Sequence, residues 1–343
     1  MAAFPQTAEE LTTDWLSEKL GCQVSGFDIE PLGEGGGLLG LVTRIHLRSD
    51  TGPETLIAKF PTLTPENRAV ATTYNMYGRE YAFYTSVAPN VPLRAPRCYH
   101  ADFTPETSDF VLLLEDLKGY RLGDQVAGCN VAEARQVIES LAGLHRSTWQ
   151  PDTIAGINQH DMPYQREGMI GGFQVGWPVV CEQFAHLLDP AVIPVLGKMP
   201  DQVNSLLDKI HDGPLVIAHG DVRLDNIFFS DSEIALVDFQ AVCKAAPEHD
   251  LAYFVTQSLP DDVRHAEDWV AVYHGHLTRD GIDYALENSR ERYRLCALYF
   301  VCYAVIIAGT LDPANERGKA LANTLLGCSL RSLAELNAFE LIS

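Results

Sequence analysis

Two patterns of hydrophobic positions divide this chain. Before residue 117, apolar residues come in short β-like runs bounded by glycine, proline and polar residues. The expected strands cover residues 27–32, 41–47, 56–60 and 110–114. From Asn130 onward, apolar residues recur at helical spacing instead. The sequence therefore predicts an α+β protein in which a small β-rich part precedes a larger helical part.

Local helix signals refine this division. Thr7 and Glu10 match a capping box, which predicts a first helix directly after them that ends at Gly21. A helical stretch at residues 69–87 interrupts the expected strands. Asn130 is expected to cap a helix of the second part, because an acidic residue stands three positions later.

The boundary between the two parts is expected near residues 115–118, where an apolar strand runs into charged, glycine-containing sequence. This division gives an N-terminal unit of residues 1–116 and a C-terminal unit of residues 117–343. A cleft between two such units is a natural place for a ligand.

Two further segments carry expectations about structure. Residues 150–176 contain several glycines and two prolines without a regular apolar period, which predicts a loop. Residues 295–308 form the longest apolar run, and it is shorter than the roughly 18–20 residues that span a bilayer. We expect this run to be a buried helix.

A glycine-rich segment precedes the second strand. Gly35, Gly36 and Gly37 lie in a stretch that formally matches G-x-G-x-x-G-x-V, but a strand follows it and not the helix that a Rossmann site requires. A glycine turn between strands lets backbone amides approach phosphate oxygens, and Lys59 at the end of the next strand would neutralise them. The alternative is a surface turn with a solvated lysine. The chain has no Walker A motif.

Glu80 stands in the helical stretch of the N-terminal part, at the edge of an apolar face. An acidic residue on a helix packed against the Lys59 strand would fix the lysine head group where phosphate oxygens arrive. We therefore expect Glu80 to pair with Lys59, whereas the alternative is a solvated surface carboxylate.

Acidic and amide residues flank a predicted β-hairpin in the second part. Asn226 comes just before its first strand and Asp238 just after its second strand, which places both at one open end. Two oxygen ligands then converge, as suits Mg²⁺ holding a polyphosphate. Asp221 precedes Asn226 by five residues, the interval of the D-x-x-x-x-N element of phosphoryl-transfer sites. His219 is expected to brace the loop.

Together these elements resemble the aminoglycoside phosphotransferase and choline kinase-like family, which has the bilobal protein-kinase-like fold. The resemblance covers most of the chain. It rests on HGDVRLDN at 219–226, LLEDL at 113–117, LAGLH at 141–145 and HDLA at 249–252. VDFQ at 237–240 and EYAFY at 80–84 are similar to the ecdysteroid-kinase-like branch.

The resemblance implies ATP and Mg²⁺ as cofactors and gives each candidate residue a role. It implies Asp221 as the catalytic base, with Asn226 and Asp238 as magnesium ligands. Nucleotide phosphates would meet the glycine loop and Lys59, which Glu80 holds in place. Adenine would meet backbone near Glu115 and Leu117. Asp250 would either brace the catalytic region or cap the helix that follows it.

The branch resemblance favours, as acceptor, a hydroxyl on a fairly apolar small molecule such as a steroid-like alcohol over a polycationic aminoglycoside. The net charge of −21 disfavours nucleic acid as a partner, because most of the surface would repel phosphates. The eight cysteines form no C-x-x-C pair. The N-terminal residues lack the features of a signal peptide, and no apolar run reaches membrane-spanning length, so we predict a cytoplasmic protein.

Three alternatives stay open at this point. A metal-dependent hydrolase would use a two-metal site of His219, Asp221, Asp238, His249 and Asp250, and it would leave the glycine hairpin and Lys59 unexplained. A non-catalytic kinase-like binding module would lack one of the required groups, and all of them are present here. Transfer of AMP in place of phosphate would use many of the same residues.

Overall fold

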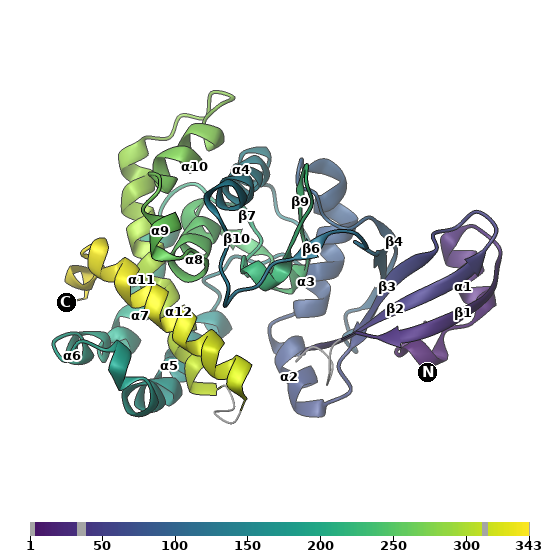
Figure 1. Cartoon of the computed structure of the whole chain (residues 1–343), viewed down its shortest axis with the longest axis horizontal. Helices are drawn as coiled ribbons and strands as arrows, with labels where there is room; N and C mark the ends of the chain where they lie inside the picture. Colours follow the sequence, from purple (N-terminus) through teal and green to yellow (C-terminus); the bar gives the residue numbers. More distant parts are fainter. Residues whose placement is uncertain (1–3, 33–38, 311–314, 343) are drawn as a thin grey trace.

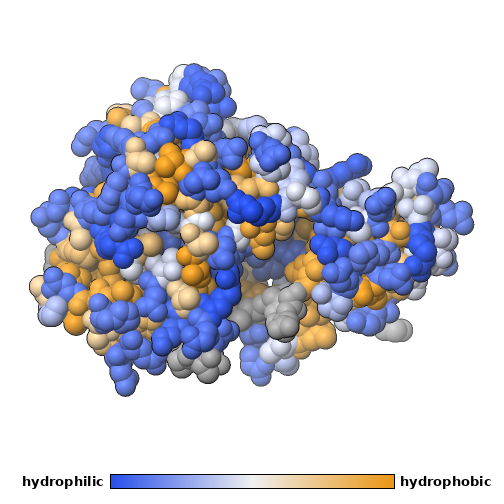
Figure 2. Space-filling model, in the orientation of Figure 1, coloured by the Kyte–Doolittle hydropathy of each residue, from blue (hydrophilic) through white to orange (hydrophobic). Residues whose placement is uncertain are grey.

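A computed structural model describes residues 4–32, 39–310 and 315–342 of the chain. Figure 1 shows a sheet and its helices on one side and a helical region on the other, with α3 (Met76–Ala82) between them. This arrangement is the predicted bilobal, protein-kinase-like one. The boundary between residues 116 and 117 stays a prediction. On the face shown in Figure 2, hydrophilic residues cover most of the surface, and hydrophobic residues form several separate patches between them.

The N-terminal region is built on a five-stranded antiparallel sheet. Its strand order is β1-β2-β3-β5-β4. The strands are β1 (Val24–Pro31), β2 (Gly40–Ser49), β3 (Thr55–Pro61), β4 (Cys98–Thr104) and β5 (Asp109–Glu115). The sequence predicted four of them and missed β4, whose residues are all half-buried and show no alternation of buried and exposed positions.

The alternation of side chains along β5 explains how this sheet is covered. Val111 and Leu113 pack with α1 (Thr13–Leu20), and Phe110, Leu112 and Leu114 pack in the core that contains α3. Lys59 of β3 lies directly opposite Leu112, so it projects to the α3 side of the sheet. The register of two strands thus directs the lysine toward the helix that carries Glu80.

The predicted capping box at Thr7 is wrong. Residues Ala8–Glu10 form one 3-10 turn, and Thr7 makes no side-chain cap. Leu11 has extended backbone, and Thr12 caps α1 by accepting a hydrogen bond of 3.2 Å from the Trp15 amide. Gly21 ends α1 with φ of 65°, as expected.

The helical stretch predicted at 69–87 is broken once. It consists of α2 (Pro65–Thr73) and α3, followed by a π-helical turn (Phe83–Val87) and a 3-10 turn (Ala88–Asn90). Asn75 separates the two helices with φ of 50°. Phe83 at the end of α3 stacks on Phe239 of the C-terminal region, with ring centroids 3.5 Å apart. This contact joins α3 to the loop that carries Asp238.

The C-terminal region is mostly helical. Its helices are α4 (Val131–Ser147), α5 (Pro163–Gln183), α6 (Ile193–Leu196), α7 (Met199–His211), α8 (Glu248–Ser258), α9 (Asp261–Arg264), α10 (Trp269–Leu277), α11 (Leu286–Thr310) and α12 (Glu316–Glu335). The 3-10 turns are Ala185–Leu187, Leu224–Asn226, Phe239–Ala241 and Ala338–Leu341. The short strands are β6 (Arg121–Leu122), β7 (Val216–Ala218), β8 (Ile227–Phe229), β9 (Ile234–Leu236) and β10 (Cys243–Ala245). Asn130 and Glu133 form the predicted capping box at the start of α4.

The loop predicted at residues 150–176 is wrong in its second half, because α5 begins at Pro163. Two of the glycines in this segment face α11, and a Cβ at Gly172 would lie 2.8 Å from the Ile306 side chain. A Cβ at Gly176 would lie 2.7 Å from the Val305 carbonyl oxygen, and a Cβ at Gly309 would lie 2.3 Å from the Gly176 Cα. These glycines therefore allow α5 and α11 to pack closely, a role that the periodicity of the sequence does not reveal.

The long apolar run forms a buried helix, as predicted. Among the described residues, α11 is the one helix long and apolar enough to cross a membrane by composition, and 67% of its most apolar window is buried. It packs against α5, α8 and α12. This helix is therefore the centre of the C-terminal core.

Candidate active site

The loop after β7 is fixed by buried polar contacts. Both carboxylate oxygens of Asp250 accept backbone hydrogen bonds, from the His219 amide at 2.7 Å and the Gly220 amide at 2.9 Å. His145 lies 3.1 Å from the same carboxylate. Gly220 has φ of 85°, and a Cβ there would lie 2.3 Å from the Ala241 carbonyl oxygen, so this position requires glycine. The buried Asp250, in the first turn of α8, is thus a brace for the loop and does not cap the helix.

His219 links this loop to the hairpin. Its Nε2 lies 3.0 Å from the Val237 carbonyl oxygen, and its Nδ1 accepts a hydrogen bond of 3.2 Å from the Asp221 amide. The side chain is fully buried. It therefore occupies the bracing position that the sequence suggested.

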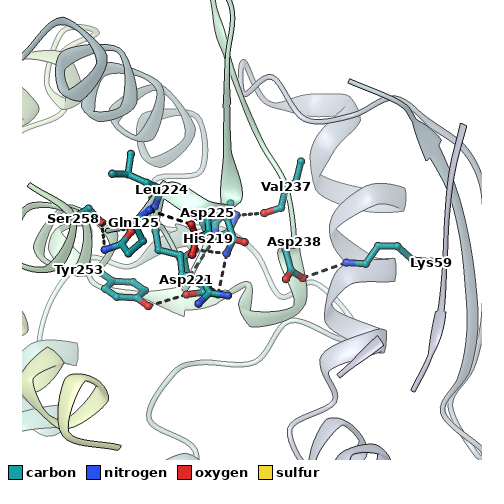
Figure 3. A network of polar contacts seen from close by, with 12 residues as sticks. Lys59, Gln125, His219, Asp221, Leu224, Asp225, Val237, Asp238, Tyr253 and Ser258 are labelled. Carbon is teal, nitrogen blue, oxygen red and sulfur yellow. Dashed lines mark hydrogen bonds and ion pairs between the residues drawn. The ribbon is translucent and has the colours of Figure 1, made fainter. Parts of the chain in front are cut away.

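Asp221 is held at both carboxylate oxygens and still reaches solvent. Oδ1 accepts a hydrogen bond of 2.9 Å from the Tyr253 hydroxyl, and Oδ2 accepts one of 3.0 Å from Nδ2 of Asn226. The Arg223 Nε lies 3.6 Å from Oδ2. The Asp221 side chain is 29% exposed. Figure 3 shows it between Tyr253 and the hairpin that leads to Asp238.

Asn226 and Asp238 lie at the same end of the β8–β9 hairpin. The Val237 amide donates a hydrogen bond of 3.0 Å to the Asn226 carbonyl, which closes that end. Asn226 uses its amide NH₂ on Asp221, and its oxygen makes no hydrogen bond within the described part of the chain. Both residues line one cavity. This pair of oxygen donors fits the preference of Mg²⁺ for oxygen ligands.

Lys59 is buried between two carboxylates. Its Nζ lies 2.7 and 2.9 Å from the two oxygens of Glu80 and 3.2 Å from Oδ1 of Asp238. Burial opposes the charged ammonium, but Asp238 and Glu80 outweigh it and raise the pKa of Lys59. Burial raises the pKa of Glu80, against the effect of Lys59. The expected pairing of Lys59 with Glu80 is therefore present.

A cavity of about 440 Å³ opens beside Lys59 and Asp238. Its apolar walls come from Val42, Ile57 and Leu114, and it also reaches Glu115 and Leu117. The Glu115 carboxylate accepts two hydrogen bonds from the Arg94 guanidinium, of 2.7 Å from Nη2 and 2.9 Å from Nη1. The Leu117 N–H makes no hydrogen bond to any described residue, so it is free to bind a ligand. The predicted Gly35, Gly36 and Gly37 lie outside the described residues.

Two further cavities follow the first one and reach Asp221. One of about 210 Å³ shares Lys59 and Asp238 with the first cavity. It shares Asp221 and Arg223 with a third cavity of about 350 Å³ on the C-terminal side. Of the aromatic residues in the C-terminal region, Tyr253 and Tyr303 line this third cavity. Asp221 therefore lies at the junction between a site beside Lys59 and a pocket with apolar walls.

The residues of the alternative two-metal site do not gather. Asp250 is occupied by backbone amides and His145. His249 lies instead with His160 and Cys243, whose ligand atoms are within 4.8 Å of one another in the buried core. Within the described ranges, the geometry therefore does not favour the hydrolase hypothesis.

Two site residues escaped the sequence analysis. Arg223 stands two positions after Asp221 and faces it, and this proximity in the loop was the available signal. Tyr253 comes from α8, the helix that also carries Asp250. Its contact with Asp221 joins residues 32 positions apart, so no local pattern indicates it.

A family model described as "Phosphotransferase enzyme family" matches residues 43–291, which is more than half of the chain. The chain belongs to this family. The phosphotransferase match includes Lys59, Glu80, Asp221, Asn226 and Asp238. No curated protein sequence matches the chain.

Solved structures similar to this phosphotransferase share its fold at low identity. A choline kinase from Cryptosporidium parvum aligns with a TM-score of 0.58 and 10% identity, over 92% of each chain. A Plasmodium vivax ethanolamine kinase aligns with a TM-score of 0.55 and 14% identity, over 90% of this chain and 83% of that one. A GDP complex of aminoglycoside 2'-phosphotransferase-IIIa aligns with a TM-score of 0.57 and 14% identity, over 93% and 98%. These likenesses show the protein-kinase-like fold.

Proposed function

We propose that this protein transfers the γ-phosphoryl group of ATP, with Mg²⁺, to a hydroxyl group of a small molecule. The observation that carries the proposal is the position of Asp221 between two cavities. On one side lies the Lys59 site, with Glu80 and Asp238. On the other side lies a separate pocket for an acceptor.

The nucleotide would occupy the cavity beside Lys59. Its adenine would contact backbone between Glu115 and Leu117, where an N–H is free, and Lys59 would bind its phosphates. Asn226 and Asp238 would hold Mg²⁺, which neutralises polyphosphate charge when bound. Glu80 keeps the lysine in place, since it is fully buried and contacts Nζ with both oxygens.

Asp221 would accept the proton of the acceptor hydroxyl. The hydroxyl oxygen would form a bond to the γ-phosphorus. The bond between the γ-phosphorus and the β–γ bridging oxygen would break, and its electron pair would leave with ADP. Hydrogen bonds from Tyr253 and Asn226 fix the direction of the carboxylate. Arg223 lines the cavity between the two sites and would stabilise charge on the transferring group.

The acceptor pocket favours a largely apolar molecule. Val70, Met76, Met169, Ile306 and Ile307 supply its apolar walls, and Asp221 is the one acidic residue among the described residues that line it. A polycationic aminoglycoside would find no second carboxylate among the described lining residues. A hydroxylated, fairly apolar compound such as a steroid-like alcohol fits this lining better. The proposal also places the protein in the cytoplasm. It includes neither a nucleic acid nor a membrane as a partner.

The test is turnover of the Asp221→Asn variant. Wild type, this variant and Asp231→Asn, a control in the exposed β8–β9 turn, are incubated with MgATP and a library of hydroxylated compounds. We expect ADP formation and a phosphorylated product with wild type and the control, and loss of both in Asp221→Asn with nucleotide binding retained. Turnover retained by Asp221→Asn would refute the assignment. An adenylylated product on the mass spectrum would replace phosphoryl transfer by AMP transfer.

A further inference from the structure

Arg79 is a buried cation at the acceptor pocket. It stands beside Glu80 on α3, and it lines the third cavity together with Asp221. Its exposed fraction is only 4%. Two adjacent residues of one short helix thus point to different sites: Glu80 contacts Lys59, and Arg79 lines the acceptor pocket.

The charge of Arg79 has no acidic partner in the described part of the chain. The guanidinium makes one hydrogen bond there, from Nη2 to the Tyr164 hydroxyl at 3.0 Å. Its Nε is buried and has no hydrogen-bond partner among the residues that the structure describes. By contrast, Arg166 on α5 lies 3.3 Å from Asp161 and 2.7 Å from Asp208. A buried charge without a partner is costly, so the position of Arg79 calls for an anion.

The rest of the pocket supports the same conclusion. Asp221, its one acidic lining residue in the described ranges, already accepts hydrogen bonds from Tyr253 and Asn226 and faces Arg223. His160 also lines the pocket, and its buried Nδ1 has no hydrogen-bond partner within residues 4–32, 39–310 and 315–342. The pocket of a strongly acidic protein therefore carries two arginines against one carboxylate.

We infer that the acceptor is a hydroxylated carboxylic acid whose carboxylate binds to Arg79 while its hydroxyl meets Asp221. The inference rests on the proposed function for the role of the hydroxyl, and on Arg79 alone for the carboxylate. A guanidinium presents donors in a planar fork that matches a carboxylate. The apolar walls between the two groups, which include Met169, Ile306 and Ile307, suit a hydrocarbon segment.

The experiment compares three chain-matched series of probes: ω-hydroxy carboxylates of increasing length, their primary amides, and ω-amino alcohols. Binding to the full-length protein is measured by calorimetry without nucleotide, so that no turnover is needed. Wild type is compared with Arg79→Gln, which removes the charge, and Arg79→Lys, which keeps it. Arg166→Gln is the matched control, because Arg166 already has carboxylate partners and does not line the pocket.

We expect wild type and Arg166→Gln to bind at least one hydroxy acid about tenfold or more tightly than its amide, since hydrogen bonds to charged groups exceed that difference. Arg79→Gln should lose the preference, and Arg79→Lys should keep part of it. Equal binding of acid and amide by wild type, tighter binding of the amino alcohol, or no binding of any acid would each overturn the inference. The comparison of acid with amide binding by wild type tests the inference even if a variant does not fold.

ADP release with MgATP is measured separately on the same probes. Phosphorylation of amides or neutral alcohols without binding of acids would leave the proposed function standing and refute the carboxylate site. Binding of acids that depends on Arg79, without any ADP release, would support the carboxylate site and count against the phosphotransferase.

Discussion

The Tyr253 hydroxyl donates a hydrogen bond of 2.9 Å to Oδ1 of Asp221. Tyr253 is almost fully buried and stacks on Phe300, with ring centroids 4.8 Å apart. Burial, reinforced by the Asp221 carboxylate, raises the pKa of Tyr253 well above its ordinary value. The phenol therefore stays protonated at neutral pH and directs the carboxylate toward the junction of the cavities. Tyr253 is thus a positioning residue for the proposed base.

The first prediction concerns Tyr253→Phe. Loss of this hydrogen bond frees one oxygen of Asp221. We expect kcat to fall about tenfold, because a hydrogen bond to a charged group contributes a free energy of about that size. The KM for ATP should stay within about twofold, because Tyr253 does not line the nucleotide cavity. Tyr293→Phe is the control, since Tyr293 is buried in α11 and makes no hydrogen bond among described residues. An unchanged kcat in Tyr253→Phe would refute the positioning role.

The second prediction concerns the Lys59 and Glu80 pair. Lys59→Met leaves the fully buried Glu80 carboxylate without its cation, which should lower the free energy of unfolding by about 3 kcal/mol. The double variant Lys59→Met/Glu80→Gln removes the uncompensated charge and should recover at least about 1 kcal/mol of this loss. Urea unfolding of the wild type and both variants measures these differences. Lower stability of the double variant than of the single one would contradict the ion pair.

The third prediction uses Glu248, which is fully buried in α8. Its Oε1 accepts a hydrogen bond of 2.7 Å from Ser289, and its Oε2 has no hydrogen-bond partner in the described part of the chain. Burial, opposed by the Ser289 hydrogen bond, raises the pKa of Glu248 from 4.5 to about 7. Because the folded state binds the proton more tightly, the stabilisation is complete below pH 4.5 and is lost as the pH rises through about 7.

Glu248→Gln has no charge to bury, so its stability relative to wild type should rise between pH 5 and pH 8. The upper limit of this rise is about 3 kcal/mol, from 1.4 kcal/mol for each pH unit of the shift. Urea unfolding at the two pH values measures it, with the exposed Glu287→Gln as control. A relative stability that falls or stays constant with pH would show that Glu248 is already ionised in the folded protein.

Local patterns in the sequence predicted most of the residues gathered near Asp221. The five-residue spacing from Asp221 to Asn226 and the hairpin that leads to Asp238 are local features, and the structure brings these residues together. The contact of Lys59 with Glu80 spans 21 residues, yet it follows from the strand and helix that carry them. The fold class followed from the change of hydrophobic period between the two regions.

Features that depend on tertiary packing escaped prediction. Residues from Pro163 onward form α5 and not a loop, and Gly176 of this helix packs closely against Val305. Arg79 resembles any charged residue of a helix in sequence, and its lack of an acidic partner in the described ranges is visible only once α3 packs on the C-terminal region. Thr12 caps α1 in place of Thr7 because Leu11 adopts extended backbone, which propensity alone does not decide.

The most direct measurement is thermal unfolding of wild type and Asp238→Ala with excess Mg²⁺ and ATP, singly and together. A ligand at about 100 times its Kd adds about 2.7 kcal/mol, or a Tm shift of about 4 °C for a protein of this size. We expect wild type to be stabilised only when both are present, and Asp238→Ala to show little or no shift. The absence of any wild-type shift, or an equal shift in Asp238→Ala, would contradict a magnesium-dependent nucleotide site at Lys59 and Asp238.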